Sequence, residues 1–137
     1  MVVLINLAAE LAKLKTLEEL TPQTVLAEGE GFALLTPYRD STVFAIKSSG
    51  KTAWERHPDG DELVQVLEGT AIIDIVTDDG PPQSFEVGAG MIAIVPQGAW
   101  HRARFSHDMT LISVTPHTEF LKLDVDDPRA ALSPASQ

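Results

Sequence analysis

The chain of 137 residues contains no cysteine, only ten basic residues and no long apolar run. Without cysteine there can be no disulfide, thiolate metal site or cysteine nucleophile, so histidine and carboxylates are the remaining metal ligands. Twenty acidic residues give a net charge of −10, which repels phosphate backbones and anionic lipid. No segment approaches the roughly 18 apolar residues of a membrane span, and no basic signal-peptide region precedes one. We therefore expect a cytoplasmic protein that binds neither nucleic acid nor membrane.

The hydrophobic pattern predicts one short helix followed by many strands. Asn6 is a good N-cap, and leucines recur at positions i, i+4 and i+7 of residues 7–14, which favours an amphipathic helix there. After Pro22, strand-length runs alternate with glycine- and proline-containing turns. We expect strands over residues 23–28, 31–36, 42–48, 51–57, 62–67, 70–77, 83–87, 91–95, 100–105 and 109–115. About ten strands in about a hundred residues indicate an all-β sandwich or barrel.

The same pattern predicts how the chain is organised. A helical segment, residues 1–22, should pack on a barrel of residues 23–123. Residues 124–137 form a polar C-terminal tail that should be loosely held. At this length a single domain is expected.

Two histidines and two carboxylates form a candidate metal site. Glu55 and His57 are two residues apart in an expected strand, so their side chains point to the same side. A proline–glycine turn then brings Glu62 back towards them, and His101 follows a second turn of this kind. Two imidazoles with one or two carboxylates suit one divalent transition metal, namely Fe, Mn, Ni or Zn. The ligand set alone does not choose among these metals.

The spacing of these residues resembles the two sequence motifs of the cupins. The segment Gly50-x4-Glu55-x-His57-x4-Glu62-x6-Gly69 is similar to the first motif, and Gly90-x5-Pro96-x-Gly98-x2-His101 is similar to the second. The resemblance covers residues 50–105 and implies a small single-domain cupin of the cupin 2 type, whose fold is a double-stranded β-helix or jelly-roll barrel. It also implies a metal site in which His57, Glu62 and His101 are ligands.

Three positions depart from these motifs. Glu55 stands where the family usually has its first histidine, Met91 replaces a common aspartate, and Phe105 replaces a terminal asparagine. The first motif is also one residue short at Gly50. The glycines and the proline of the turns are kept, so the fold expectation stands. Glu55 is then either a fourth metal ligand or a catalytic general base.

The alternative to a metal site is a hydrogen-bonded polar cluster that remains inside the barrel as a vestige. Two buried carboxylates without a cation would be costly, because like charges at short range raise one pKa, and this favours a metal. His107 and His117 lie outside the motifs and are expected at the surface. Trp54 should be a packing residue or an interface anchor, whereas Trp100 is an open candidate for the pocket mouth.

Two functions fit this sequence. The first is a metal-dependent enzyme of dioxygenase or isomerase type, and the second is a non-catalytic module that binds a metal or a small ligand. If His101 points inward, alternation places Ala103 and Phe105 inward and Arg102 and Arg104 outward. Such an apolar wall without an arginine clamp favours a small, fairly apolar molecule over a sugar phosphate.

We also expect a homodimer. Small open jelly rolls leave free strand edges, and outward positions such as Leu63, Leu67 and Ile72 add apolar area that one chain cannot cover.

Overall fold

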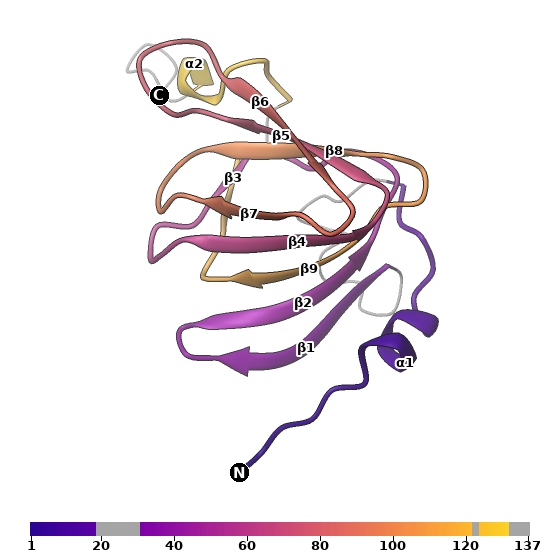
Figure 1. Cartoon of the computed structure of the whole chain (residues 1–137). Coiled ribbons are helices and arrows are strands. Elements are labelled where there is room, and N and C mark those ends of the chain that lie inside the picture. The colour runs from indigo at the N-terminus through magenta and orange to yellow at the C-terminus, as the bar shows by residue number, and fades with distance from the viewer. Residues whose placement is uncertain (19–30, 122–123, 132–137) are drawn as a thin grey trace.

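The computed structural model describes residues 1–18, 31–121 and 124–131 (Figure 1). The strand expected over residues 23–28 and the end of the helical segment lie outside the described residues. The described elements are α1 (Leu7–Ala12), β1 (Phe32–Tyr38), β2 (Ser41–Lys47), β3 (Glu55–Arg56), β4 (Glu62–Glu68), β5 (Thr70–Ile75), β6 (Gln83–Gly88), β7 (Ile92–Val95), β8 (His101–Phe105), β9 (Thr110–Thr115), β10 (Glu119–Phe120) and α2 (Pro128–Ala131).

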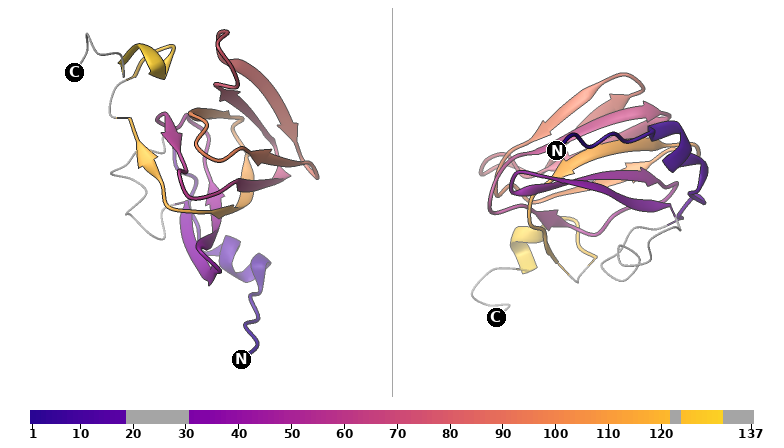
Figure 2. Two further views of the ribbon diagram at one scale, coloured as in Figure 1. Left: turned by 90° about the vertical axis from the view of Figure 1, so that its left-hand side faces the viewer. Right: turned by 90° about the horizontal axis from the view of Figure 1, so that it is seen from below.

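The strands form two five-stranded antiparallel sheets. One sheet has the order β1-β2-β9-β4-β7 and the other the order β10-β3-β8-β5-β6. The two sheets lie over one another, with the chain passing repeatedly between them (Figures 1 and 2). This arrangement confirms the expected all-β jelly roll, although the sheets do not close into a continuous barrel.

The core lies between the sheets because inward positions of the strands are apolar. In β4, Val64 and Val66 are buried, whereas the intervening positions are half-buried. Ala71 and Ile73 of β5 face them from the second sheet, in the same buried cluster. The β4–β5 turn depends on Gly69, whose φ is +72° and whose missing Cβ would lie 2.9 Å from the Cα of Met109. The period-two pattern therefore places one side of each strand in the core.

Helix α1 covers part of the outer face of the first sheet. The side chain of Asn6 accepts a hydrogen bond from the backbone N–H of Ala9, which confirms the expected N-cap. Leu14, just beyond the helix, is buried against Ala33 of β1 and Ala45 of β2. The helical segment thus packs on the sheet, although the helix ends at Ala12, two residues earlier than expected.

The C-terminal segment is not loosely held within residues 124–131. Trp54 donates a hydrogen bond from its indole to the carbonyl of Val125 at 2.6 Å, and Arg102 donates to the same carbonyl at 3.0 Å. Pro128 is fully buried, and Arg129 donates to the carbonyls of residues 78 and 80. Sequence pattern gave no sign of these contacts, because they join backbone carbonyls to side chains far away in the chain.

Two further elements differ from expectation. The strand expected over residues 51–57 is regular only at Glu55–Arg56, where it pairs with both β8 and β10. Strand β10, a two-residue partner of β3, was not expected at all. Within the described residues, no helix is long and apolar enough to cross a membrane.

Candidate metal centre

The four residues singled out in the sequence meet between the two sheets. Glu55 lies in β3 and is paired with His101, the first residue of β8. His57 follows β3 directly, and Glu62 opens β4 in the opposite sheet. One ligand atom from each of the four side chains lies within 4.8 Å of all the others. The arrangement therefore fits a metal site, as the spacing of these residues predicts.

The distances within the cluster suit ligands that share one ion. Nε2 of His57 lies 3.3 Å from Oε2 of Glu62, and Nε2 of His101 lies 3.4 Å from Oε1 of the same carboxylate. Oε1 of Glu55 lies 3.2 Å from Nε2 of His101 and 3.8 Å from Nε2 of His57. Metal–ligand bonds of about 2.0–2.2 Å place neighbouring ligand atoms roughly 3–3.5 Å apart. Three of these four separations fall in that range, and the fourth is slightly longer.

Hydrogen bonds orient both imidazole rings. Nδ1–H of His101 donates to the carbonyl of Ala99 at 2.9 Å. The Thr118 hydroxyl donates to the carbonyl of Pro116 at 3.3 Å, so its oxygen is left to accept from Nδ1–H of His57 at 3.1 Å. With Nδ1 engaged in each ring, Nε2 is the atom that faces the cluster. Bonds of this kind fix the tautomer of metal-binding histidines.

Both Nε2 atoms are buried and have no hydrogen-bond partner, although carboxylate oxygens lie within ion-pair distance. Buried polar atoms without a partner are rare and need an explanation. A divalent cation supplies one, because it accepts the nitrogen lone pairs and neutralises the carboxylates at the same point. The donor set, two nitrogens and two carboxylates without sulfur, is one that Fe, Mn, Ni and Zn accept.

The side chains of the cluster shift one another's pKa values. Burial raises the pKa of Glu62, but the rings of His101 and His57 outweigh it and lower that pKa to about 2. For His101, burial lowers the pKa, but the carboxylates of Glu55 and Glu62 raise it to about 10. Without a metal, this raised pKa favours the protonated form of the His101 ring. A bound cation takes the place of that proton.

The two carboxylates differ in their hydrogen bonds and in their exposure to solvent. Oε2 of Glu62 accepts a hydrogen bond from the hydroxyl of Thr115 at 2.7 Å, and Ser113 lies 2.9 Å from that hydroxyl. The Glu62 side chain is 8% exposed, whereas that of Glu55 is 19% exposed. Glu62 is thus fixed by its neighbours, while Glu55 has more access to solvent.

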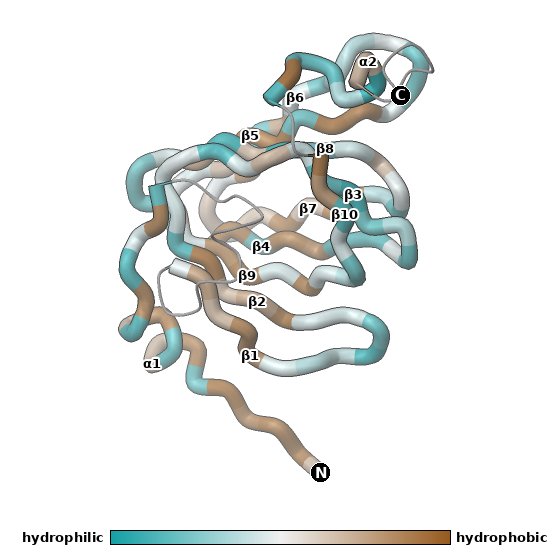
Figure 3. The backbone as a smooth tube through the Cα atoms, turned by 180° about the vertical axis from the view of Figure 1, so that it is seen from behind, coloured by the Kyte–Doolittle hydropathy of each residue, from teal (hydrophilic) through white to brown (hydrophobic). Residues whose placement is uncertain are grey.

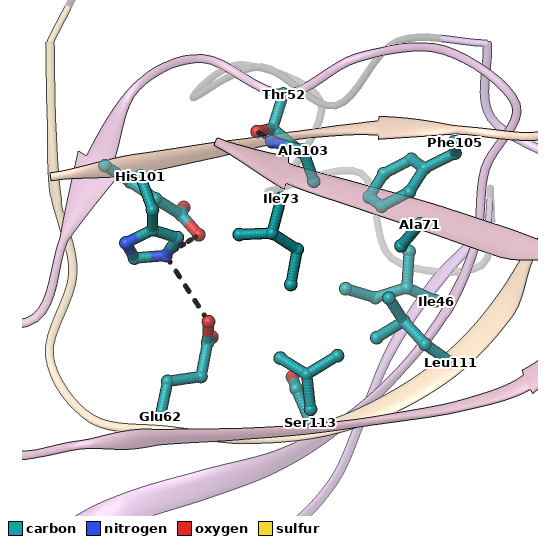
Figure 4. Close-up of a pocket in the computed structure, with 12 residues that line it drawn as sticks. Ile46, Thr52, Glu62, Ala71, Ile73, His101, Ala103, Phe105, Leu111 and Ser113 are labelled. Atoms are coloured by element: carbon teal, nitrogen blue, oxygen red, sulfur yellow. Dashed lines mark hydrogen bonds and ion pairs between the residues drawn. The ribbon is translucent and has the colours of Figure 1, made fainter. Parts of the chain in front are cut away.

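A cavity of about 50 Å³ adjoins the cluster inside the jelly roll. Figure 4 shows His101 and Glu62 at its polar end, Ile73 in the middle, and Ala71 and Phe105 towards the other end. Its lining residues are Ile46, Thr52, Glu55, Glu62, Val64, Ala71, Ile73, His101, Ala103, Phe105, Leu111 and Ser113. None of these described lining residues is lysine or arginine. The expected apolar wall, with Ala103 and Phe105 inward, is therefore present.

The remaining candidates from the sequence lie outside the cluster. His107 and His117 are exposed, as expected. Trp54 is buried, with Arg102 stacked on its ring at 4.6 Å, so it is a packing residue. Trp100 is not among the residues that line the cavity, and Arg56 stacks on it at 4.8 Å.

Arg102, beside His101 in β8, helps to hold that strand in place. Its guanidinium also donates to the carboxylate of Asp74 in the neighbouring strand β5 at 3.0 Å. Burial raises the pKa of Asp74, but hydrogen bonds from Ser84 and Arg102 outweigh it and hold the pKa below its usual value. The side of β8 that faces away from the cavity is thus anchored by an ionised pair.

Thr118 is a residue that sequence reasoning missed, and its role can be tested. Thr118→Val removes the oxygen that accepts from Nδ1–H of His57, so the ring should be less well oriented. We expect a metal affinity about 10- to 100-fold lower, measured by competition with a chromophoric chelator. The control is Thr77→Val at an exposed position, which should leave the affinity unchanged. Equal affinities of the two variants would contradict this role.

Comparisons with known proteins agree with this fold. Residues 42–115, more than half of the chain, match the family model described as Cupin domain. An uncharacterized protein of Acanthamoeba polyphaga mimivirus is 26% identical over 88 residues, which are 64% of this chain and 48% of that protein. The chain thus matches about half the length of this relative.

Two solved structures show the same fold at low identity. A protein of Neisseria meningitidis has a TM-score of 0.62 and 22% identity, with 84% of this chain and 100% of that chain covered. A hydroquinone 1,2-dioxygenase in complex with Cd²⁺ and 4-hydroxybenzonitrile has a TM-score of 0.54 and 16% identity, with 61% and 62% covered.

Proposed function

This chain belongs to the cupin family, and on that premise we propose that it is a metal-dependent enzyme of dioxygenase or isomerase type. Its substrate is a small, fairly apolar molecule that enters the cavity beside His57, Glu62, His101 and Glu55. The metal is one divalent transition ion per chain.

The observation that carries this proposal is the pair of buried, unpartnered Nε2 atoms at the polar end of an otherwise apolar cavity. A purely structural polar cluster would satisfy both nitrogens with hydrogen bonds. Open coordination positions next to an apolar cavity are instead typical of sites that bring a substrate to a metal. A bound metal would supply Lewis-acid or redox chemistry there.

The two carboxylates have different tasks in this proposal. Glu62, held by Thr115, is a fixed ligand. Glu55 contributes Oε1 to the cluster, and its side chain also lines the cavity. Its second oxygen, Oε2, is then the atom that accepts a proton from the substrate, because a general base must reach the reacting group. The partial exposure of Glu55 allows that proton to leave to solvent.

The cavity walls support a neutral substrate. With no lysine or arginine among its described lining residues, the cavity offers no cationic side chain outside the metal cluster that could bind a phosphate or a second carboxylate. A volume of about 50 Å³ admits about three water-sized groups. The part of the substrate that lies next to the metal is therefore small, with an oxygen for the metal and a short apolar body.

A two-arm screen of small neutral phenols and hydroxyketones tests this proposal. Full-length protein loaded with Fe(II) is assayed for oxygen uptake, and Mn(II)-loaded protein is assayed without oxygen for deuterium exchange from D₂O into the substrate. We expect turnover in one arm that His101→Ala abolishes. Compounds that bind the loaded protein but are unchanged in both arms would contradict catalysis and favour the non-catalytic binding module.

A further inference from the structure

We propose that Trp54 is a positioning residue for the metal centre and that it acts together with residues 124–131, called here the C-terminal strap. On the outer face of the sheet, Trp54 and Arg102 bind the same strap carbonyl, that of Val125. This contact holds Glu55 against His101 on the inner face. The inference rests on the metal site of the proposed function, but not on the proposed reaction.

The ladder between β3 and β8 is short. Strand β3 comprises only Glu55–Arg56, and within the described residues its register with β8 is the pair Glu55–His101. Its other neighbour, β10, also has two residues. Such short strands share few backbone hydrogen bonds, and a segment of this kind opens easily. Contacts outside the ladder therefore contribute much of what fixes Glu55 relative to His101.

Trp54 and Arg102 are the chain neighbours of the two paired site residues. Side chains alternate between the faces of a sheet, so Trp54 and Arg102 point outward where Glu55 and His101 point inward. The guanidinium of Arg102 lies 4.6 Å from the centre of the Trp54 ring, which shows that the two side chains meet on the outer face. The outer pair thus lies directly behind the inner pair.

One backbone oxygen joins the two outer side chains to the strap. The carbonyl of Val125 accepts the indole N–H of Trp54 at 2.6 Å and Nη1–H of Arg102 at 3.0 Å. Trp54 is 1% exposed, so water would not replace a lost bond of its indole. The backbone carbonyl of Trp54 also accepts the N–H of Leu121 at 2.9 Å. The chain that follows β10 therefore binds Trp54 through both its backbone and its side chain.

The strap itself is fixed on both sides of Val125. Lys51 lies 2.9 Å from the carboxylate of Asp124, Pro128 is fully buried, and Arg129 donates to two carbonyls of the loop between β5 and β6. Figure 3 shows α2 near the β5–β6 end of this sheet, whereas β10 is its opposite edge strand. The strap thus crosses the outer face, and its Val125 carbonyl is a fixed acceptor.

The strap contact matters more for Glu55 than for the other carboxylate of the cluster. Glu62 is held directly by the hydroxyl of Thr115. Glu55 lies in the short strand β3, with Oε1 3.2 Å from Nε2 of His101. Metal–ligand distances tolerate deviations of only about 0.2 Å, so a small displacement of β3 would take Glu55 out of range. Trp54 therefore acts on the metal through Glu55.

The variant Trp54→Phe tests this role, because it keeps an aromatic ring for Arg102 and removes the N–H that reaches Val125. In the full-length protein we expect a metal affinity about 10-fold lower, measured by competition with a chromophoric chelator. The matched control is Trp100→Phe. Trp100 directly precedes His101 and stacks with Arg56, and its replacement should leave the affinity unchanged.

A double-variant cycle separates positioning from general destabilisation. If Trp54 acts through Glu55, Trp54→Phe should have almost no effect on metal affinity in a Glu55→Ala background. A variant that merely loosens the fold would lower the affinity in both backgrounds. Equal losses with and without Glu55 would therefore overturn the proposal, as would equal affinities of Trp54→Phe and Trp100→Phe.

Hydrogen exchange of the metal-free protein tests the strap contact without the ion. We expect the amides of residues 54–57 to exchange at least about 10-fold faster in Trp54→Phe than in Trp100→Phe. Unchanged exchange at these amides, in a wild type that binds metal, would overturn this proposal alone. A wild type that binds no metal would instead contradict the proposed function and the positioning role together.

A second variant serves if circular dichroism shows that Trp54→Phe does not fold. Arg102→Lys keeps the positive charge beside Asp74 but lacks the planar fork that binds Asp74 and the Val125 carbonyl at once. We expect the same three results from it: a lower metal affinity, no further loss in the Glu55→Ala background and faster exchange at residues 54–57. Wild-type values in all three measurements would overturn the proposal.

Discussion

Replacement of His101 with alanine should lower the metal affinity by more than about 100-fold. The imidazole is a direct member of the cluster, with Nε2 3.2 Å from Glu55 and 3.4 Å from Glu62. Its loss should therefore cost more than the loss of a supporting residue, which typically costs 10- to 100-fold. Affinity is measured by chelator competition, so the result does not depend on knowing the substrate.

The matched control is His107→Ala, because His107 is exposed in a turn outside the cluster. It should keep the wild-type affinity. Circular dichroism of both variants separates loss of the metal from loss of the fold. A folded His101→Ala protein that binds metal as tightly as His107→Ala would contradict the site.

Replacement of Glu55 should have the second-largest effect, because this position sets the charge of the site. Two neutral histidines, two carboxylates and a divalent cation sum to a net charge of zero, whereas a third histidine in place of Glu55 would leave +1. The carboxylate makes the metal a weaker Lewis acid. It should also favour Mn(II) or Fe(II) relative to Ni(II) or Cu(II), although the latter still bind more tightly in free competition.

Two variants separate the roles of Glu55. Glu55→Gln keeps the size and an oxygen but removes the charge, and we expect metal affinity to fall at least about 10-fold. Glu55→His restores the nitrogen ligand usual in the motif and should bind metal at least as tightly as Glu55→Gln does. Wild-type affinity in Glu55→Gln, with turnover lost, would contradict the ligand role and leave Glu55 as a base only.

Much of the site could be predicted from sequence because turn chemistry fixes it locally. The glycines and prolines around Glu55, His57 and Glu62 force the chain to fold back, so their convergence follows from short-range geometry. For His101, no local rule gives its distance to the other three residues, and its signals in the sequence are the turn before it and the resemblance to the second motif. In the structure, its pairing with Glu55 across β3 and β8 makes that connection.

The supporting residues could not be predicted. Thr115 and Thr118 reach Glu62 and His57 from 53 and 61 residues away. No spacing in the sequence distinguishes a threonine that supports such a side chain from an ordinary threonine in or beside a strand. The neighbours of outward-facing residues in the sheet could not be predicted either. Alternation shows that Leu63 points outward, but only the strand register shows that Ile94 lies beside it.

The most direct test of this account is the metal content of the full-length protein. The protein is reconstituted without oxygen with Fe(II) or Mn(II), freed of loosely bound ions and analysed by inductively coupled plasma mass spectrometry. The account predicts one ion per chain in the wild type and in His107→Ala, and almost none in His101→Ala. A wild-type protein that retains no more metal than His101→Ala would contradict it.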